Sequence, residues 1–153
     1  MCSMRESVYD AMGGADAVLR LAHAWHERVM ADPVVSHAFS HGYREDHTER
    51  LAAYWGEQLG GPPAYTDGLG GDHSTVLRMH SGNGEHHEMD RRAEACFAQA
   101  LDDADIPDAP ELRRTLLYWF HWGIEVMDSH PETPDDVPLD LPLPRWSWNG
   151  LVS

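Results

Sequence analysis

The sequence predicts an all-α protein with one main domain. At 153 residues the chain is long enough to bury a core of its own, and hydrophobic residues make up 42% of it. In several stretches apolar residues recur at the three- and four-residue spacing of a helix, and no stretch alternates like a half-buried strand. Clusters of glycine and proline separate these stretches, as expected for loops that join helices.

Most of the expected helices end at a pattern that opposes their continuation. The opening turns stop at Gly13-Gly14, because glycine adopts the conformations that a sharp stop needs. The second helix stops at Asp32-Pro33 and the third at Gly60-Gly61-Pro62. Ser74 is the expected N-cap of the fourth helix. The expected helices cover about residues 7–12, 15–31, 44–59, 74–80, 85–104 and 111–129.

The charge and the cysteines exclude several classes of function. Eleven Lys plus Arg residues, all of them arginine, face 26 Asp plus Glu residues, which gives a formal net charge of -15. A surface this acidic argues against nucleic acid and anionic membranes as partners. Two cysteines do not make a disulfide framework, and no apolar run is long enough to cross a membrane. We therefore expect a reducing, cytoplasmic setting.

The end of the chain differs in composition from the rest. Residues 131–153 hold five prolines and many acidic residues, so a regular helix is not expected there. Two large aromatics, Trp146 and Trp148, favour a tail that folds back onto the body, although a partner surface is the alternative. The predicted organisation is a helical domain over residues 1–130 and a non-helical tail, packed on or near it, over 131–153.

Two histidines are expected on helices that face each other across the glycine-rich loop of residues 60–72. His47 shares one helical face with Leu51, Tyr54, Trp55 and Gln58, because these residues are three or four positions apart. After the loop, His80 shares a face with Val76 and Met79. Two such helices can sandwich a flat apolar cofactor. Haem is the natural candidate, since imidazole is a standard axial ligand of its iron.

An ordered set of short patterns resembles the truncated haemoglobins, and most closely the second group of that family. The similarity covers about residues 9–128. Its patterns, in order, are Tyr9-Asp10-Ala11-Met12-Gly13-Gly14, the run Trp25-His26-Glu27-Arg28-Val29-Met30-Ala31-Asp32-Pro33, then Phe39, then Gly60-Gly61-Pro62-Pro63-Ala64-Tyr65, and His80. The resemblance implies a globin-like two-over-two helical sandwich around haem b, with diatomic gases as ligands.

The same resemblance implies roles for individual residues. His80 matches the proximal ligand of the haem iron, and Phe39 the phenylalanine that packs on the haem plane. His26 and His47 match distal positions, although the family usually has tyrosine where this chain has His26. Its second group usually has tryptophan at the position of Ala93. Further cofactor contacts are expected from Leu51, Tyr54, Trp55, Val76, Met79, Ala93 and Phe97.

The distal histidines have three possible roles. Either His26 or His47 could donate an N–H to a bound ligand, ligate the iron when no ligand is present, or act as a proton donor to nitrite or peroxide. Tyr54 and Trp55 could donate to the ligand or to water, or be plain core. Arg78 and Tyr65 could pair with the haem propionates, with surface exposure as the more ordinary alternative for Tyr65.

The sequence thus predicts a haem-binding protein for oxygen, nitric oxide, nitrite or peroxide, either as a reversible binder or as a redox enzyme with an unidentified electron donor. It would be a monomer or a homodimer. One alternative is a non-haem metal site built from His73, His80, His86, His87 and Glu88. Another is an interaction domain that uses the Trp146 and Trp148 tail. No role is assigned to His23, His37, His41, His73, His121 and His130.

Overall fold

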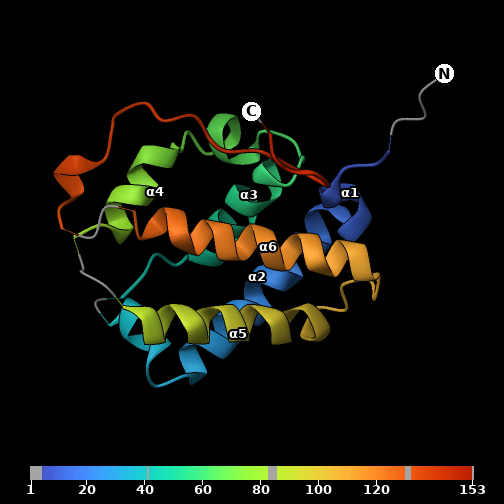
Figure 1. Ribbon diagram of the computed structural model, residues 1–153, viewed down its shortest axis with the longest axis horizontal. Coiled ribbons are helices and arrows are strands. Elements are labelled where there is room, and N and C mark those ends of the chain that lie inside the picture. The colour runs from blue at the N-terminus through green and yellow to red at the C-terminus, as the bar shows by residue number, and fades with distance from the viewer. Residues whose placement is uncertain (1–4, 41, 83–85, 130–131, 153) are drawn as a thin grey trace.

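The computed structural model describes residues 5–40, 42–82, 86–129 and 132–152. It is mostly helical, as the sequence predicts (Figure 1). The helices are α1 (Val8–Met12), α2 (Gly14–Ala31), η1 (Val35–Phe39), α3 (His47–Gln58), η2 (Ala64–Gly68), α4 (His73–His80), α5 (His87–Asp103), α6 (Pro110–Met127) and η3 (Pro134–Asp136). Two short strands, β1 (Trp146–Ser147) and β2 (Gly150–Leu151), pair antiparallel with Trp146 opposite Leu151.

Four long helices form two packed pairs, which is the two-over-two arrangement. α2 packs against α3, α5 packs against α6, and α2 also contacts α5. Figure 1 shows α5 and α6 side by side in front of α2, with α4 beside one end of α6. The core between the pairs includes Leu21, Phe97, Leu101 and Leu116, each at most 2% exposed. These side chains lie on the apolar faces that the helical spacing predicts.

The structure gives α4 and α6 starts that differ from the expected ones. Asp72, rather than Ser74, caps α4, because its carboxylate accepts from the Thr75 N–H at 2.7 Å. Ser74 lies inside the helix, and its hydroxyl oxygen accepts from the Leu141 N–H at 2.9 Å. α6 begins at Pro110, which suits the first helical position because proline has no N–H to pair. The predicted start of α5 at Glu85 lies outside the described residues.

The glycine-rich loop of residues 60–72 is organised by one buried carboxylate. Glu57, 1% exposed, accepts from the Tyr65 and Thr66 N–H groups at 3.1 and 2.9 Å and from the Thr66 hydroxyl at 2.7 Å. These bonds hold the π-helical turn η2 against the end of α3. Tyr65 is 6% exposed, so the interpretation of it as a surface residue is wrong. Its ring packs beside Gly71, where any Cβ would lie 2.3 Å from the tyrosine ring.

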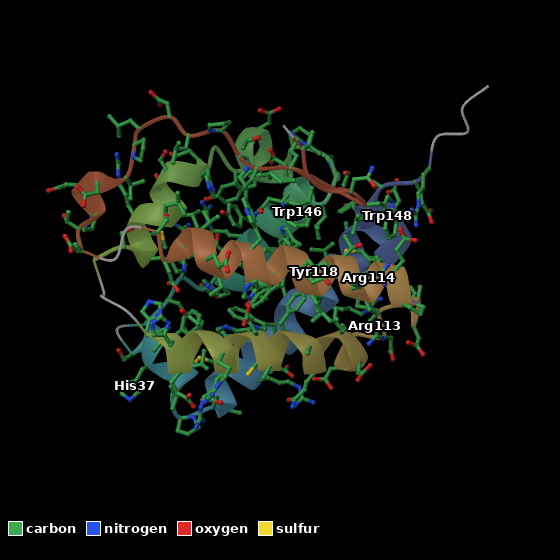
Figure 2. All side chains as sticks on the ribbon, in the orientation of Figure 1. His37, Arg113, Arg114, Tyr118, Trp146 and Trp148 are labelled. Atoms are coloured by element: carbon green, nitrogen blue, oxygen red, sulfur yellow. The ribbon has the colours of Figure 1, made fainter. Side chains whose placement is uncertain are left out.

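The segment after α6 runs along the body and returns to α1 (Figure 1). It contacts α4 through η3 and through the Leu141 N–H. Trp146 packs against Trp122 of α6 with 5.7 Å between ring centroids, and the Trp148 indole N–H donates to the Glu6 carbonyl at 2.8 Å. Figure 2 shows Trp146 beside the middle of α6 and Trp148 close to α1. No described helix has the length and hydropathy needed to cross a membrane.

Candidate functional site

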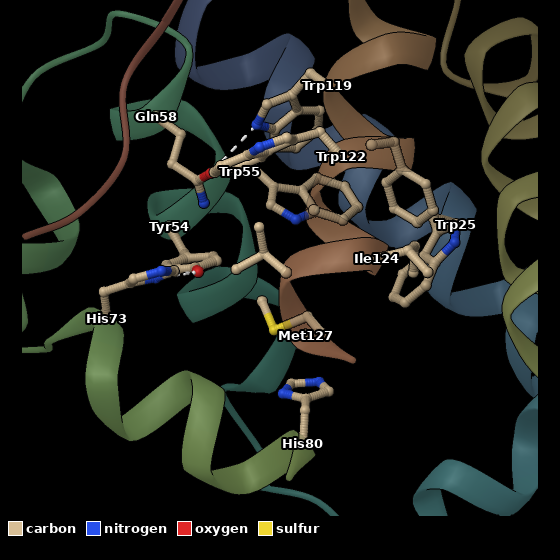
Figure 3. A pocket seen from close by; sticks show the side chains of 13 residues that line it. Trp25, Tyr54, Trp55, Gln58, His73, His80, Trp119, Trp122, Ile124 and Met127 are labelled. Carbon is tan, nitrogen blue, oxygen red and sulfur yellow. Dashed lines mark hydrogen bonds between the residues drawn. The ribbon is translucent and has the colours of Figure 1, made fainter. Parts of the chain in front are cut away.

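A half-open pocket of about 100 Å³ lies between α3, α4 and α6. Figure 3 shows His73 and His80 reaching it from α4, Tyr54 and Gln58 from α3, and Met127 from the end of α6. The rest of the lining is mainly apolar and aromatic, and includes Trp25, Trp55, Trp119, Phe120, Trp122, Ile124 and Val126. A few polar groups converging in an apolar pocket are typical of a cofactor site.

His80 is the last residue of α4, and its ring points from that helix toward the pocket (Figure 3). Its Nδ1 lies 2.8 Å from the Val76 carbonyl oxygen, and only a protonated Nδ1 can donate to a carbonyl. This bond therefore fixes the tautomer and puts the lone pair on Nε2. His80 as a residue is exposed, but the protein groups around its ring desolvate it and lower its pKa. The imidazole is thus neutral at neutral pH, as a metal ligand must be.

His26 and His47 lie together in an aromatic cluster with Phe39 and Tyr43. The two imidazole centroids are 5.3 Å apart, and Phe39 is 5.2 Å from His26 and 5.1 Å from His47. Nδ1 of each histidine is buried without a hydrogen-bond partner. Burial lowers the pKa of both rings, and the nearby His26 and His80 imidazoles lower that of His47 further. Both are therefore neutral near pH 7, and each offers one N–H donor.

Tyr54 and His73 form a buried pair that the sequence analysis did not identify. The Tyr54 oxygen lies 2.8 Å from His73 Nδ1, and the two residues are 5% and 7% exposed. Gln58 also lines the pocket and accepts from the Trp119 indole N–H at 3.2 Å. The sequence signal that could have identified His73 was its spacing. His73 and His80 are seven positions apart and so share a face of α4.

Several predicted cofactor contacts lie near the pocket without being part of its lining. Met79 is 70% exposed, because the inward face of α4 is set by His73, Leu77 and His80 and not by Val76, Met79 and His80. Leu51 and Val76 are partly buried against the core. Phe97 is fully buried and stacks on Phe120 at 4.2 Å. The Ala93 carbonyl accepts from the Trp25 indole, and Arg78 is partly exposed.

The described residues contain one other group that could hold a metal: His86, Asp90 and Asp128. It includes neither His73 nor His80 of the non-haem metal site considered above. His86 Nδ1 lies 2.8 Å from an Asp90 oxygen, and Nε2 lies 3.5 Å from an Asp128 oxygen. Since both nitrogens face carboxylates, the arrangement is that of a bridging ion pair. His37 lies away from the pocket (Figure 2), and His41 and His130 lie outside the described residues.

The residues present fit a haem group. His80 has the tautomer that an axial ligand needs, and the pocket beside it is largely apolar. The unpartnered His26 and His47 nitrogens lie in the neighbouring aromatic cluster. The free volume of about 100 Å³ is below the roughly 300–1,000 Å³ of typical ligand pockets. Side chains at the rim must therefore move outward when a porphyrin enters.

Solved structures with the same fold are bacterial haemoglobins. The hemoglobin of Chloroflexus aurantiacus has a TM-score of 0.68 and 22% identity, over 80% of this chain and 98% of that one. A thermostable hemoglobin of Thermobifida fusca has a TM-score of 0.65 and 25% identity, over 89% and 100%. The group II truncated hemoglobin of Bacillus anthracis has a TM-score of 0.67 and 19% identity, over 84% and 95%.

Comparison with curated proteins gives no match. The model of the bacterial-like globins matches residues 7–124. The chain therefore belongs to the bacterial-like globin family and has the truncated haemoglobin fold, for which the implied cofactor is haem iron.

Proposed function

We propose that this globin holds haem b through His80 and binds a small ligand beside His26 and His47. The observation that carries the proposal is the 2.8 Å bond from His80 Nδ1 to the Val76 carbonyl, which puts the lone pair on Nε2. Haem iron, when bound, supplies an open coordination position for a ligand such as oxygen, nitric oxide, nitrite or peroxide. Residues 1–130 would form the binding domain and 131–153 its tail.

The distal histidines would act as hydrogen-bond donors. A buried polar atom without a partner costs about 1–3 kcal/mol, and Nδ1 of both His26 and His47 is in that condition. A ligand with partial negative charge would supply the missing partner. Such a charge-assisted bond contributes about 1.5–3 kcal/mol, so it would slow the departure of the ligand. If the reaction is redox, the same N–H groups could pass a proton to nitrite or peroxide, and an external electron donor would be needed.

The absorption spectrum of the purified, haem-loaded protein tests the proximal assignment. Wild-type protein should show a Soret band, and His80→Ala should lose the histidine-ligated spectrum and bind haem less tightly. His37→Ala is the matched control, because this exposed histidine lies away from the pocket. An unchanged spectrum and affinity in His80→Ala would refute the assignment. A wild-type protein that purifies with iron or zinc and without haem would favour a non-haem site.

Oxygen dissociation kinetics test the distal assignment. Loss of one charge-assisted hydrogen bond should raise the dissociation rate about 10- to 100-fold in His47→Leu or His26→Leu. The variant with the larger change identifies the dominant donor. His23→Leu is the control, because its exposed ring pairs with Glu49 at 3.9 Å on the outside of the molecule. Rates within twofold of wild type in both His26→Leu and His47→Leu would contradict the donor role.

A further inference from the structure

Tyr54 and His73 bring a phenol and an imidazole together inside the pocket. They come from α3 and α4, both side chains line the pocket with His80, and the Tyr54 oxygen is 2.8 Å from His73 Nδ1 (Figure 3). A phenol O–H is a stronger donor than an imidazole N–H, and an imidazole nitrogen is a stronger acceptor than a phenol oxygen, so we take the phenol as the donor and Nδ1 as the acceptor.

Both members of the pair are neutral in the resting protein. Burial lowers the pKa of His73, so its imidazole is neutral at neutral pH and has one nitrogen lone pair free to accept a proton. Burial also raises the pKa of Tyr54, with a further rise from Tyr65, so the phenol keeps its proton. A hydrogen-bonded neutral phenol and neutral base is the arrangement in which the proton moves when the phenol loses an electron.

Other oxidisable side chains around the pocket lack such a base in the bonds that the structure describes. The Trp25 indole donates to the Ala93 carbonyl, and the Trp119 indole donates to the Gln58 amide oxygen. The Tyr65 ring centroid is 5.1 Å from that of Tyr54, but the cation that acts on the Tyr65 phenol is the Arg50 guanidinium, which offsets part of the rise in its pKa that burial causes. A guanidinium keeps its protons and accepts none. Of these four side chains, Tyr54 alone is bonded to a group that can take its proton.

We propose that Tyr54 is an internal one-electron donor for peroxide reduction in this pocket, and that His73 Nδ1 takes its phenolic proton. The inference rests on the proposed function, because haem held by His80 would supply the redox chemistry that activates peroxide. The activity is that of a peroxidase with a protein-based reductant. It uses the pair on α3 and α4, separately from the donors in the His26 and His47 cluster.

The step balances in atoms and electrons. Reduction of one hydrogen peroxide molecule to two waters consumes two electrons and two protons. The protons come from solvent. Tyr54 supplies one of these electrons, and haem held by His80 would supply the other. The phenolic O–H bond of Tyr54 breaks and an N–H bond forms at His73 Nδ1. The products on the chain are a neutral tyrosyl radical and an imidazolium, and no net charge is created on Tyr54 in its buried position.

Freeze-quench electron paramagnetic resonance of the haem-loaded protein, mixed with hydrogen peroxide, tests the proposal. We expect a tyrosyl radical in wild type, its loss in Tyr54→Phe, and its retention in the control Tyr65→Phe. In His73→Gln the radical should form more slowly than in wild type, because the proton lacks its nearby base. Wild-type radical formation should also be slower in heavy water, whereas a purely structural role for the pair predicts no isotope effect.

The outcomes separate this inference from the proposed function. Normal Soret spectra with equal radical yields in wild type and Tyr54→Phe would overturn the electron-donor role and leave haem binding intact. A wild-type protein that binds no haem would overturn both. Equal loss of signal in Tyr54→Phe and Tyr65→Phe would also overturn the assignment, because it would place the radical on no single tyrosine.

Discussion

Glu57 is almost fully buried on α3, and its carboxylate ties the loop of residues 60–72 to the end of that helix. It accepts three hydrogen bonds from Tyr65 and Thr66, and Arg145 of the tail lies 3.5 Å away. The bonds place Tyr65 against the Tyr54 ring. One polar side chain therefore connects the loop, the tail and the wall of the pocket, which the helical spacing of apolar residues could not reveal.

Glu57→Ala should destabilise the protein by about 3 kcal/mol, because it leaves the buried Tyr65 N–H without a partner and removes two further bonds. Urea unfolding at neutral pH measures the change. Glu49→Ala, an exposed change on the same helix, should alter stability by less than about 0.5 kcal/mol. A Glu57→Ala protein as stable as Glu49→Ala would show that the loop is held by other contacts.

Some of the residues that line the pocket had been named from the sequence. His80 was predicted from its neighbours in the chain and from family resemblance, and the structure turns its ring toward the pocket. His73 was missed because its partner, Tyr54, lies 19 residues earlier, across the loop of residues 60–72. The distance between two such groups depends on how that loop folds, and the loop is set by the buried Glu57. His86, placed by the sequence in the alternative metal site, likewise meets Asp128 only through tertiary packing.

At the scale of elements, α4 is the weakest part of the site. It is eight residues long, and isolated helices of that length are marginal in water. The inward face of α4 was predicted wrongly at Met79. The three residues used, Val76, Met79 and His80, are too few to fix which side of a short helix faces the core. Buried Leu77 and the His73 bond to α3 decide it. The longer helices α2, α5 and α6 were predicted well because their apolar faces repeat over several turns.

Asp72→Ala should loosen α4 and the hold of His80 on haem. The Asp72 carboxylate caps the helix through the Thr75 N–H and hydroxyl, and loss of a cap costs about 1 kcal/mol. We expect a lower unfolding free energy and faster haem transfer to an apoglobin acceptor. Asp67→Ala, in the exposed part of η2, is the control. Equal haem-transfer rates in the two variants would mean that the Asp72 cap does not affect how firmly His80 holds haem.

The contact between the start of α5 and the end of α6 should respond to pH. Burial, and then a hydrogen bond and charge from Asp90, raise the pKa of Asp128 from 3.8 to about 7. A raised folded-state pKa means that this contribution to stability is complete below pH 3.8 and is lost as pH rises through about 7. Asn cannot ionise, so Asp128→Asn should lose less stability than wild type between pH 6 and 8.

Melting temperatures of wild type, Asp128→Asn and the exposed control Asp108→Asn, measured across that interval, check the sign. The control should follow wild type. A wild-type protein whose stability relative to Asp128→Asn rises with pH would mean that the His86 ion pair outweighs the repulsion from Asp90.

For the whole molecule, the tail joins parts that are far apart in the sequence. It contacts α4 through Leu141, α3 through Arg145, α6 through Trp146 and the start of the chain through Trp148. The tail thus contacts all three helices that form the pocket. The prolines that oppose a helix there are compatible with an extended course, but the sequence could not show where the tryptophans pack.

Trp146→Ala and Trp148→Ala should separate the effect of the tail on the pocket from its effect on the fold. Trp146 packs on Trp122, which lines the pocket, whereas Trp148 contacts Glu6 and the Arg5 guanidinium, 3.8 Å from its ring. An aromatic pair contributes about 0.5–1.5 kcal/mol and a cation–π contact about 0.5–1 kcal/mol, so both variants should lose similar stability in urea. Haem dissociation should accelerate mainly in Trp146→Ala, since Trp122 then loses the support that holds it against the pocket. Equal dissociation rates in the two variants would mean that the tail acts on stability alone.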